Sequence, residues 1–130
     1  MMSNEEFATR FKTRTKQFVI RSTNLFRALP NTEEARIFGK QYLRAASSVG
    51  ANYRAACRAR SAEEFFSKIN IVVEEADEAC FWMEVIIETN LLPENKVAAL
   101  LKEAKEITAV AAAARFNTPS KSNKNYKKNK

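Results

Sequence analysis

Three arginines crowd one short stretch of the chain. Arg54, Arg58 and Arg60 lie within the segment SSVGANYRAACRARS, and the next acidic residue along the chain is Glu63. Like charges four residues apart on a helix repel each other by about 0.2 to 0.5 kcal/mol, so a functional or structural partner is needed to offset them. Guanidinium groups in such a cluster are suited to binding the oxygens of phosphates or carboxylates. The spacing therefore raises the question of which anions these arginines meet.

A longer row of basic residues includes this cluster. Arg36, Lys40, Arg54 and Arg58 fall at spacings of 4, 14 and 4 and share one side of a helix, and we call this row the basic ridge. The net charge is +7 and the sequence pI is about 9.6. The ridge therefore predicts contact with the phosphate backbone of RNA or DNA. The alternative is a solvated face, or a face paired with acids elsewhere in the chain.

Further cations lie on the first helix and at the carboxyl end. The first helix carries Lys12, Lys16 and Arg27 on one flank of its apolar stripe and Arg10, Arg14 and Arg21 on the other flank. Residues 117–130, NTPSKSNKNYKKNK, have no acid and no apolar repeat, which predicts a disordered basic tail. The tail lysines that are expected to grip a phosphate backbone are Lys121, Lys124, Lys127, Lys128 and Lys130. Tyr126 between them can stack on a base, although a purely solubilising terminus is the alternative.

Residues that could support catalysis or bind a metal are few. Four acids between residues 74 and 78 offer carboxylates, but the chain has no histidine, no Gly-rich phosphate loop and no nucleophile motif. Cys57 and Cys80 are 23 residues apart and form no C-x-x-C pattern. We therefore expect no enzymatic activity, no metal and no cofactor, and we expect both cysteines to be small buried hydrophobic residues.

Composition predicts long helices. The chain has 130 residues, 45% of them hydrophobic, with only two Gly and three Pro, which is typical of one all-α domain. Caps and prolines place helices from Ser3 or Asn4 to Leu29, from a cap at Asn31 or Thr32 to about Arg60, from Ser61 to about Asn90, and from Pro93 to about Phe116. Short connections make them antiparallel neighbours. Residues 1–116 are thus expected to form an up-down-up-down four-helix bundle.

No apolar run reaches the length that spans a bilayer, and the N-terminus lacks the apolar core of a signal peptide. We therefore expect a cytoplasmic protein without membrane contact.

The third helix carries apolar residues on more than one side. Ile71, Trp82 and Val85 lie together outside its main apolar face, which predicts an interface between copies of the chain. The alternative is that Trp82 covers the edge of its own bundle.

Charge is divided unevenly between the helices. Residues 3–29 and 30–60 each carry +4, whereas residues 61–93 carry −7. Arginines of the first two helices are therefore expected to pair with acids of the third helix, in the same subunit or the next. A polar network at the edge of the second helix should fix helix register or a contact between subunits. Its expected members are Gln41, Arg44, Ser48, Asn52, Glu75 and Glu78.

Two stretches, GKQYLRAASSVGANYRAACRARS and FFSKINIVVEEADEACFW, closely resemble the four-helix-bundle family named for proteins encoded in intervening sequences of 23S ribosomal RNA genes. The resemblance covers about residues 7–92 and implies up-down bundles that assemble into five-fold rings, without enzymatic activity. Accessory proteins of diversity-generating retroelements, which partner a reverse transcriptase and bind nucleic acid, are similar in architecture. The family often has Glu where this chain has Ala55, so the second helix is more basic here.

These observations lead to two functional hypotheses. The first is a homopentameric, non-enzymatic accessory protein that binds structured RNA or a ribonucleoprotein through a repeated basic surface, with a reverse transcriptase as a candidate partner. The second is a homo-oligomeric scaffold that binds proteins and has no role with nucleic acid.

Overall fold

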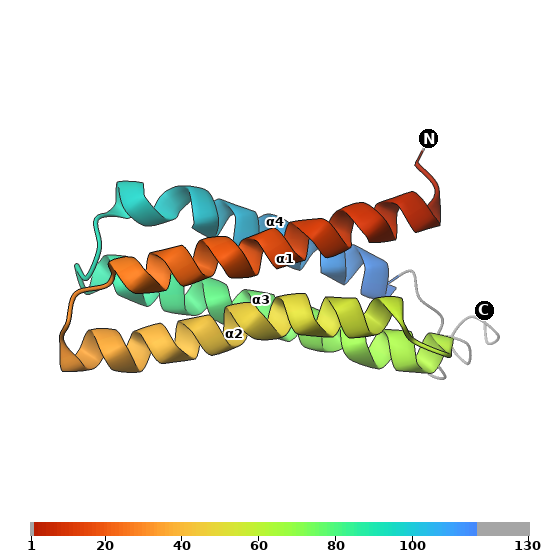
Figure 1. Ribbon diagram of the computed structural model, residues 1–130, viewed down its shortest axis with the longest axis horizontal. Coiled ribbons are helices and arrows are strands. Elements are labelled where there is room, and N and C mark those ends of the chain that lie inside the picture. Colours follow the sequence, from red (N-terminus) through yellow and green to blue (C-terminus); the bar gives the residue numbers. More distant parts are fainter. Residues whose placement is uncertain (1, 117–130) are drawn as a thin grey trace.

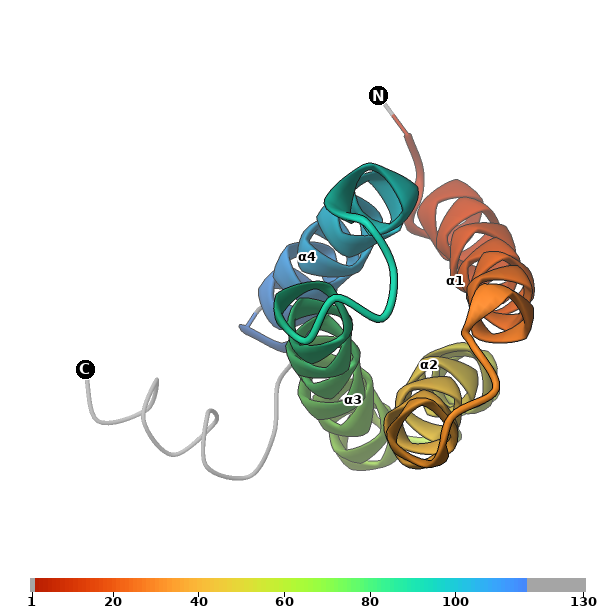
Figure 2. The ribbon, with the colours of Figure 1, turned by 90° about the vertical axis from the view of Figure 1, so that its left-hand side faces the viewer.

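Four α-helices make up the part of the chain that the computed structural model describes, residues 2–116 (Figure 1). They are α1 (Asn4–Ala28), α2 (Glu33–Cys57), α3 (Ala62–Glu88) and α4 (Glu94–Phe116). The helices alternate in direction, and the end view shows them in the order α1, α2, α3, α4 around a common axis (Figure 2). The predicted all-α, up-down-up-down bundle is confirmed. The predicted basic tail lies outside the described residues.

Side-chain caps set three of the helix starts. The hydroxyls of Ser3, Thr32 and Ser61 accept hydrogen bonds from backbone N–H groups three residues further on, at 3.1, 3.2 and 3.0 Å. Each cap satisfies one of the donors that a helix N-terminus leaves unpaired. The predicted end of the second helix near Arg60 is wrong by three residues. Because Ser61 must be extended to cap α3, the preceding residues make the reversal, and α2 ends at Cys57.

The core is formed by one apolar stripe from each helix. Phe11 and Phe18 of α1 lie against the buried tyrosines of α2, Tyr42 and Tyr53, and Phe11 meets the Tyr53 ring edge to face at 4.6 Å between centroids. The Tyr42 hydroxyl donates to Ser22 Oγ at 2.6 Å, and burial raises the pKa of Tyr42, so this hydroxyl keeps its proton. A polar pair thus crosses the α1–α2 contact inside an otherwise apolar core.

Glycine sets the distance between α1 and α2. A Cβ atom at Gly50 would lie 2.7 Å from Val19 Cγ2 and 3.4 Å from the Thr15 carbonyl oxygen, and one at Gly39 would lie 2.7 Å from Leu29 Cδ1. Val19 is β-branched and holds one rotamer in a helix, so it cannot easily move away. Each glycine costs a helix about 1 kcal/mol relative to alanine, and the close approach offsets that cost.

An ion pair joins α1 to α4. Arg14 binds Glu103 through two hydrogen bonds, Nε to Oε2 at 2.8 Å and Nη2 to Oε1 at 2.7 Å, and its Nη2 also reaches Glu106 Oε2 at 2.8 Å. The hydrogen bonds from Arg14 lower the pKa of Glu103 below its ordinary value, against the opposing effect of burial. The expectation that arginines of the first helix pair with the third helix is therefore wrong for Arg14, whose flank faces α4.

This ion pair makes stability depend on pH. A carboxylate whose pKa is lowered by folding contributes stability above its unfolded pKa, about 4.3, and loses it as pH falls through the lower folded value. We expect Glu103→Gln to lower the free energy of unfolding at pH 7 by about 1 kcal/mol, a modest figure because Arg14 is partly exposed. The deficit relative to wild type should shrink towards pH 3, where Glu103 itself becomes protonated.

Urea unfolding at several pH values and constant ionic strength measures this effect. Asp77→Asn is the control, because Asp77 is exposed and forms no ion pair within residues 2–116. A Glu103→Gln deficit of equal size at pH 7 and pH 3 would contradict the role given to the ion pair.

Candidate nucleic-acid interface

A groove of about 690 Å³ runs along the outer surface between α1 and α2, and we call it the basic groove. Its lining residues are Lys12, Thr13, Lys16, Val19, Ile20, Ser47, Gly50, Ala51, Arg54 and Arg58. The groove lies where Gly50 brings the two helices together. No Asp or Glu is among its lining residues. Its lining therefore combines four cationic side chains with aliphatic and hydroxyl-bearing ones.

The four cations of the basic groove come from two helices. Lys12 and Lys16 are one turn apart on α1, while Arg54 lies in the last turn of α2 and Arg58 is its C-cap. A spacing of four residues corresponds to a rise of about 6 Å along a helix. All four are exposed, and none forms an ion pair within the described residues. Two short rows of charge therefore face solvent across a shared groove.

The structure divides the basic ridge into two parts. Arg54 and Arg58 line the basic groove, whereas Arg36 and Lys40 do not. Arg36 lies 18 residues before Arg54, or about 27 Å along the helix axis. Its Nη1 donates to Asn31 Oδ1 at 2.7 Å, in the connection that precedes α2. Lys40 is exposed. The four cations of the basic ridge are thus spread over a greater length than those of the basic groove. The sequence pattern does not predict the groove, because its residues come from two helices.

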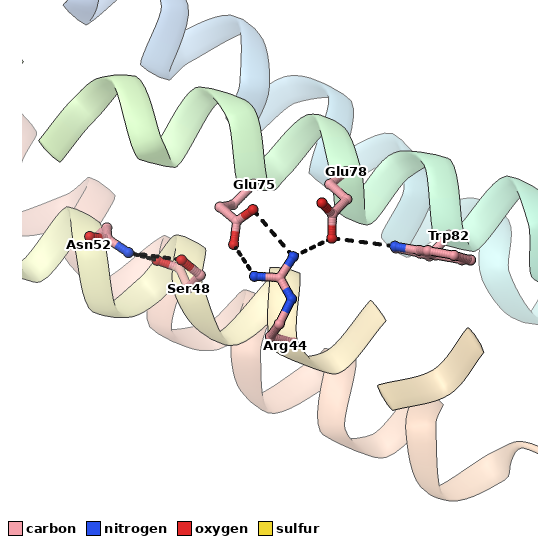
Figure 3. A network of polar contacts seen from close by, with 6 residues as sticks. All are labelled: Arg44, Ser48, Asn52, Glu75, Glu78 and Trp82. Carbon is pink, nitrogen blue, oxygen red and sulfur yellow. Dashed lines mark hydrogen bonds and ion pairs between the residues drawn. The ribbon is translucent and has the colours of Figure 1, made fainter. Parts of the chain in front are cut away.

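The expected polar network also separates into parts (Figure 3). Arg44 Nη1 donates to Glu75 Oε2 at 2.7 Å, and Arg44 Nη2 donates to Glu75 Oε1 at 3.4 Å and to Glu78. These hydrogen bonds raise the pKa of Arg44 above its ordinary value. Glu78 Oε2 in turn accepts from Trp82 Nε1 at 3.4 Å. Arg44 is therefore paired with two carboxylates of α3, whereas Arg54 and Arg58 form no ion pair within the described residues.

The remaining members of that expected network lie apart from the ion pair. Asn52 Nδ2 donates to the Ser48 hydroxyl at 2.8 Å and to the Ser48 carbonyl oxygen at 2.9 Å, within α2 itself (Figure 3). Gln41 is exposed and makes no side-chain hydrogen bond to the other members within residues 2–116. Of the polar residues predicted on the second helix, Arg44 is thus the one that hydrogen-bonds to α3 within the described residues.

Aromatic side chains gather where α2 meets α3. Trp82 stacks on Phe38 with centroids 5.7 Å apart and meets the edge of Phe81 at 5.0 Å, and we call these three residues the aromatic cluster. Trp82, Ile71 and Val85 are each partly buried, so Trp82 fills part of its own subunit's edge. Phe81 is 54% exposed and Ile37 on α2 is 53% exposed. These two residues, which the sequence pattern does not single out, are the most exposed large apolar residues of α2 and α3.

The cysteines and the acids place no metal site in the described helices. Within residues 2–116, no three His, Cys, Asp or Glu side chains gather closely enough to hold a metal ion. Cys80 is buried, but the expectation of a buried Cys57 is wrong, because this residue ends α2 and its side chain is exposed. None of the described helices is long and apolar enough to cross a membrane.

Comparisons with known proteins agree with the fold. The family model described as 23S rRNA-intervening sequence protein matches residues 9–113. A solved structure from Bacteroides thetaiotaomicron, described as a protein with unknown function from the S23 ribosomal protein family, is 30% identical with a TM-score of 0.76. The match covers 81% of this chain and 97% of that chain. A search of curated proteins gives no significant match.

Proposed function

The chain belongs to the family of 23S rRNA-intervening sequence proteins, and we propose that it is a non-enzymatic accessory protein that binds nucleic acid through its basic surface. Structured RNA, alone or in a ribonucleoprotein, is the proposed target, and a reverse transcriptase is one candidate protein partner. The observation that carries the proposal is the basic groove, whose four cations meet no acid within residues 2–116.

The pairing of the other arginines strengthens this argument. Arg14 and Arg44 each bind two carboxylates, on α4 and α3 respectively. Acids on these two helices thus neutralise arginines that face them. Uncompensated cations gathered on one surface attract a polyanion and release its counterions, which is the main source of affinity for a nucleic-acid backbone. The same cations supply no set of base-reading contacts, so binding should depend little on sequence.

Assembly into a homopentameric ring is part of the proposal. Phe81 on α3, which contacts the partly buried Trp82, and Ile37 on α2 leave apolar surface exposed, and Ile71 and Val85 are partly buried. Exposed apolar side chains that gather on one face favour burial against another protein. A ring would repeat the basic groove around its circumference, and several weak contacts to one RNA would then act together.

The same apolar surface favours the second candidate function, a homo-oligomeric scaffold that binds another protein. The two candidates differ in what the cations bind, since a scaffold would use them for an acidic protein or leave them solvated. Binding to RNA is therefore the measurement that separates them.

Nucleic-acid binding should be strong at low salt and should depend on the groove arginines. We expect Arg54→Glu with Arg58→Glu to weaken RNA binding at least about tenfold at about 50 mM salt. Because each lost phosphate contact removes about 0.7 from the slope of log affinity against log salt on a single strand, the slope should also flatten by about 1.4 units. Fluorescence anisotropy across a salt series measures both quantities.

Lys102→Glu with Lys105→Glu is the matched control, since both lysines are exposed on α4 and the change in net charge is the same. A chain lacking residues 117–130 separates the contribution of the tail lysines from that of the groove. No RNA binding by wild type at about 50 mM salt would reject the nucleic-acid function and favour the scaffold.

The ring should depend on exposed apolar residues of α3. We expect light scattering to give the mass of a pentamer for wild type, and Phe81→Glu to dissociate it because a charge cannot be buried unpaired in an apolar interface. Helix content should persist, since Phe81 is largely exposed within the subunit. Phe116→Glu, at a residue that is 82% exposed at the end of α4, is the control. A monomeric wild type at micromolar concentration would refute the ring.

A further inference from the structure

We propose that the basic groove is a binding site for single-stranded nucleic acid, in which the four cations hold successive phosphates and one base lies against Ile20. This inference rests on the proposed function and adds to it the form of the nucleic acid and the place where it binds. The shape of the groove, the placement of its charges and its aliphatic lining residues support this assignment.

The cations stand on both sides of the groove. Lys12 and Lys16 belong to α1, while Arg54 and Arg58 belong to α2, and all four line the same concave surface. A strand lying between the two helices would have basic groups along both of its sides. Without such a strand, four like charges face each other across a short distance with no acid among the lining residues, which is an unfavourable arrangement that a polyanion would relieve.

Aliphatic side chains also line the basic groove. Val19, Ile20, Gly50 and Ala51 line the groove, and Ile20 is 46% exposed. An isolated exposed isoleucine is ordinary. Ile20, however, lies one turn beyond Lys16 on α1 and lines the same groove, so it offers an apolar face to a ligand that those cations hold. Sugar rings and base faces of an unpaired strand have apolar surface that can cover Ile20, and Thr13 and Ser47 add hydroxyl groups to the lining of the same groove.

The shape of the site favours one strand over a duplex. Packed helices are separated by about 8 to 10 Å, so a groove between them is narrow and is concave. A duplex is a wide convex cylinder that keeps its base faces stacked inside and is usually read by an element that protrudes into one of its grooves. A duplex on this surface would contact the exposed cations but leave Ile20 uncovered. Proteins that hold single strands combine a basic groove with an apolar platform for bases, as this surface does.

The test compares a single strand with a duplex of the same length. Wild-type protein is titrated by fluorescence anisotropy against an unstructured RNA of about 12 nucleotides, within the range of known single-strand sites, and against the corresponding duplex. We expect the single strand to bind at least about tenfold more tightly. Circular dichroism and thermal melting of every variant check that the bundle remains folded.

Two variants test the groove itself. Ala51→Glu places an acid among the four cations without removing any of them, and it should weaken single-strand binding about tenfold, whereas Ala109→Glu on the exposed face of α4 makes the same charge change elsewhere and should have little effect. Ile20→Ser keeps every charge and removes the apolar contact. It should weaken single-strand binding about threefold and leave duplex binding unchanged.

The outcomes separate the two proposals. If wild type binds neither RNA at about 50 mM salt, the proposed function fails and the inference fails with it. If wild type binds RNA but prefers the duplex, or if Ala51→Glu binds as tightly as Ala109→Glu, nucleic-acid binding stands and the groove is not its binding site. If Ala51→Glu weakens binding while Ile20→Ser does not, the groove is a phosphate site only and the single-strand assignment is overturned.

Discussion

The close contact of α1 with α2 is the constraint on which the surface of this protein depends. Gly50 leaves room for Val19, and this contact brings one flank of α1 beside the last two turns of α2. Lys12 and Lys16 thereby meet Arg54 and Arg58 around one groove. A larger residue at position 50 would have to push the helices apart, because Val19 Cγ2 would lie 2.7 Å from its Cβ. Packing in the interior therefore determines the arrangement of charge outside.

The second determinant is where the acids lie. Glu75 and Glu78 on α3 neutralise Arg44, and Glu103 and Glu106 on α4 neutralise Arg14. Both arginines point from the first two helices towards a helix that carries acids. The groove between α1 and α2 faces neither α3 nor α4, so its cations have no comparable partner within residues 2–116. Ion pairs thus connect α1 to α4 and α2 to α3, whereas the groove between α1 and α2 keeps cations without an ion pair in the described part of the chain.

Most of the fold could be predicted from the sequence because local signals set the ends of the helices. Ser3, Thr32 and Ser61 are caps whose hydroxyls act within three residues, and a periodic apolar stripe marks what each helix buries. The site could be predicted only in part. The sequence predicts Arg54 and Arg58 as a pair, but their neighbours Lys12 and Lys16 come from another helix. Which turns of two helices face each other depends on packing at Gly50 and Val19, and a sequence pattern does not contain that register. The same limit applies to Arg14, whose partners on α4 are 89 and 92 residues away.

The central claim is that one surface, between α1 and α2, contacts nucleic acid. Ultraviolet cross-linking of the full chain to a uridine-rich single-stranded RNA, followed by mass spectrometry of the linked peptides, tests it most directly. The account predicts cross-links in peptides that contain residues 12–20 of α1 and residues 47–58 of α2, because these residues line the basic groove. Cross-links confined to the outer faces of α3 and α4, with none on the groove peptides, would contradict it.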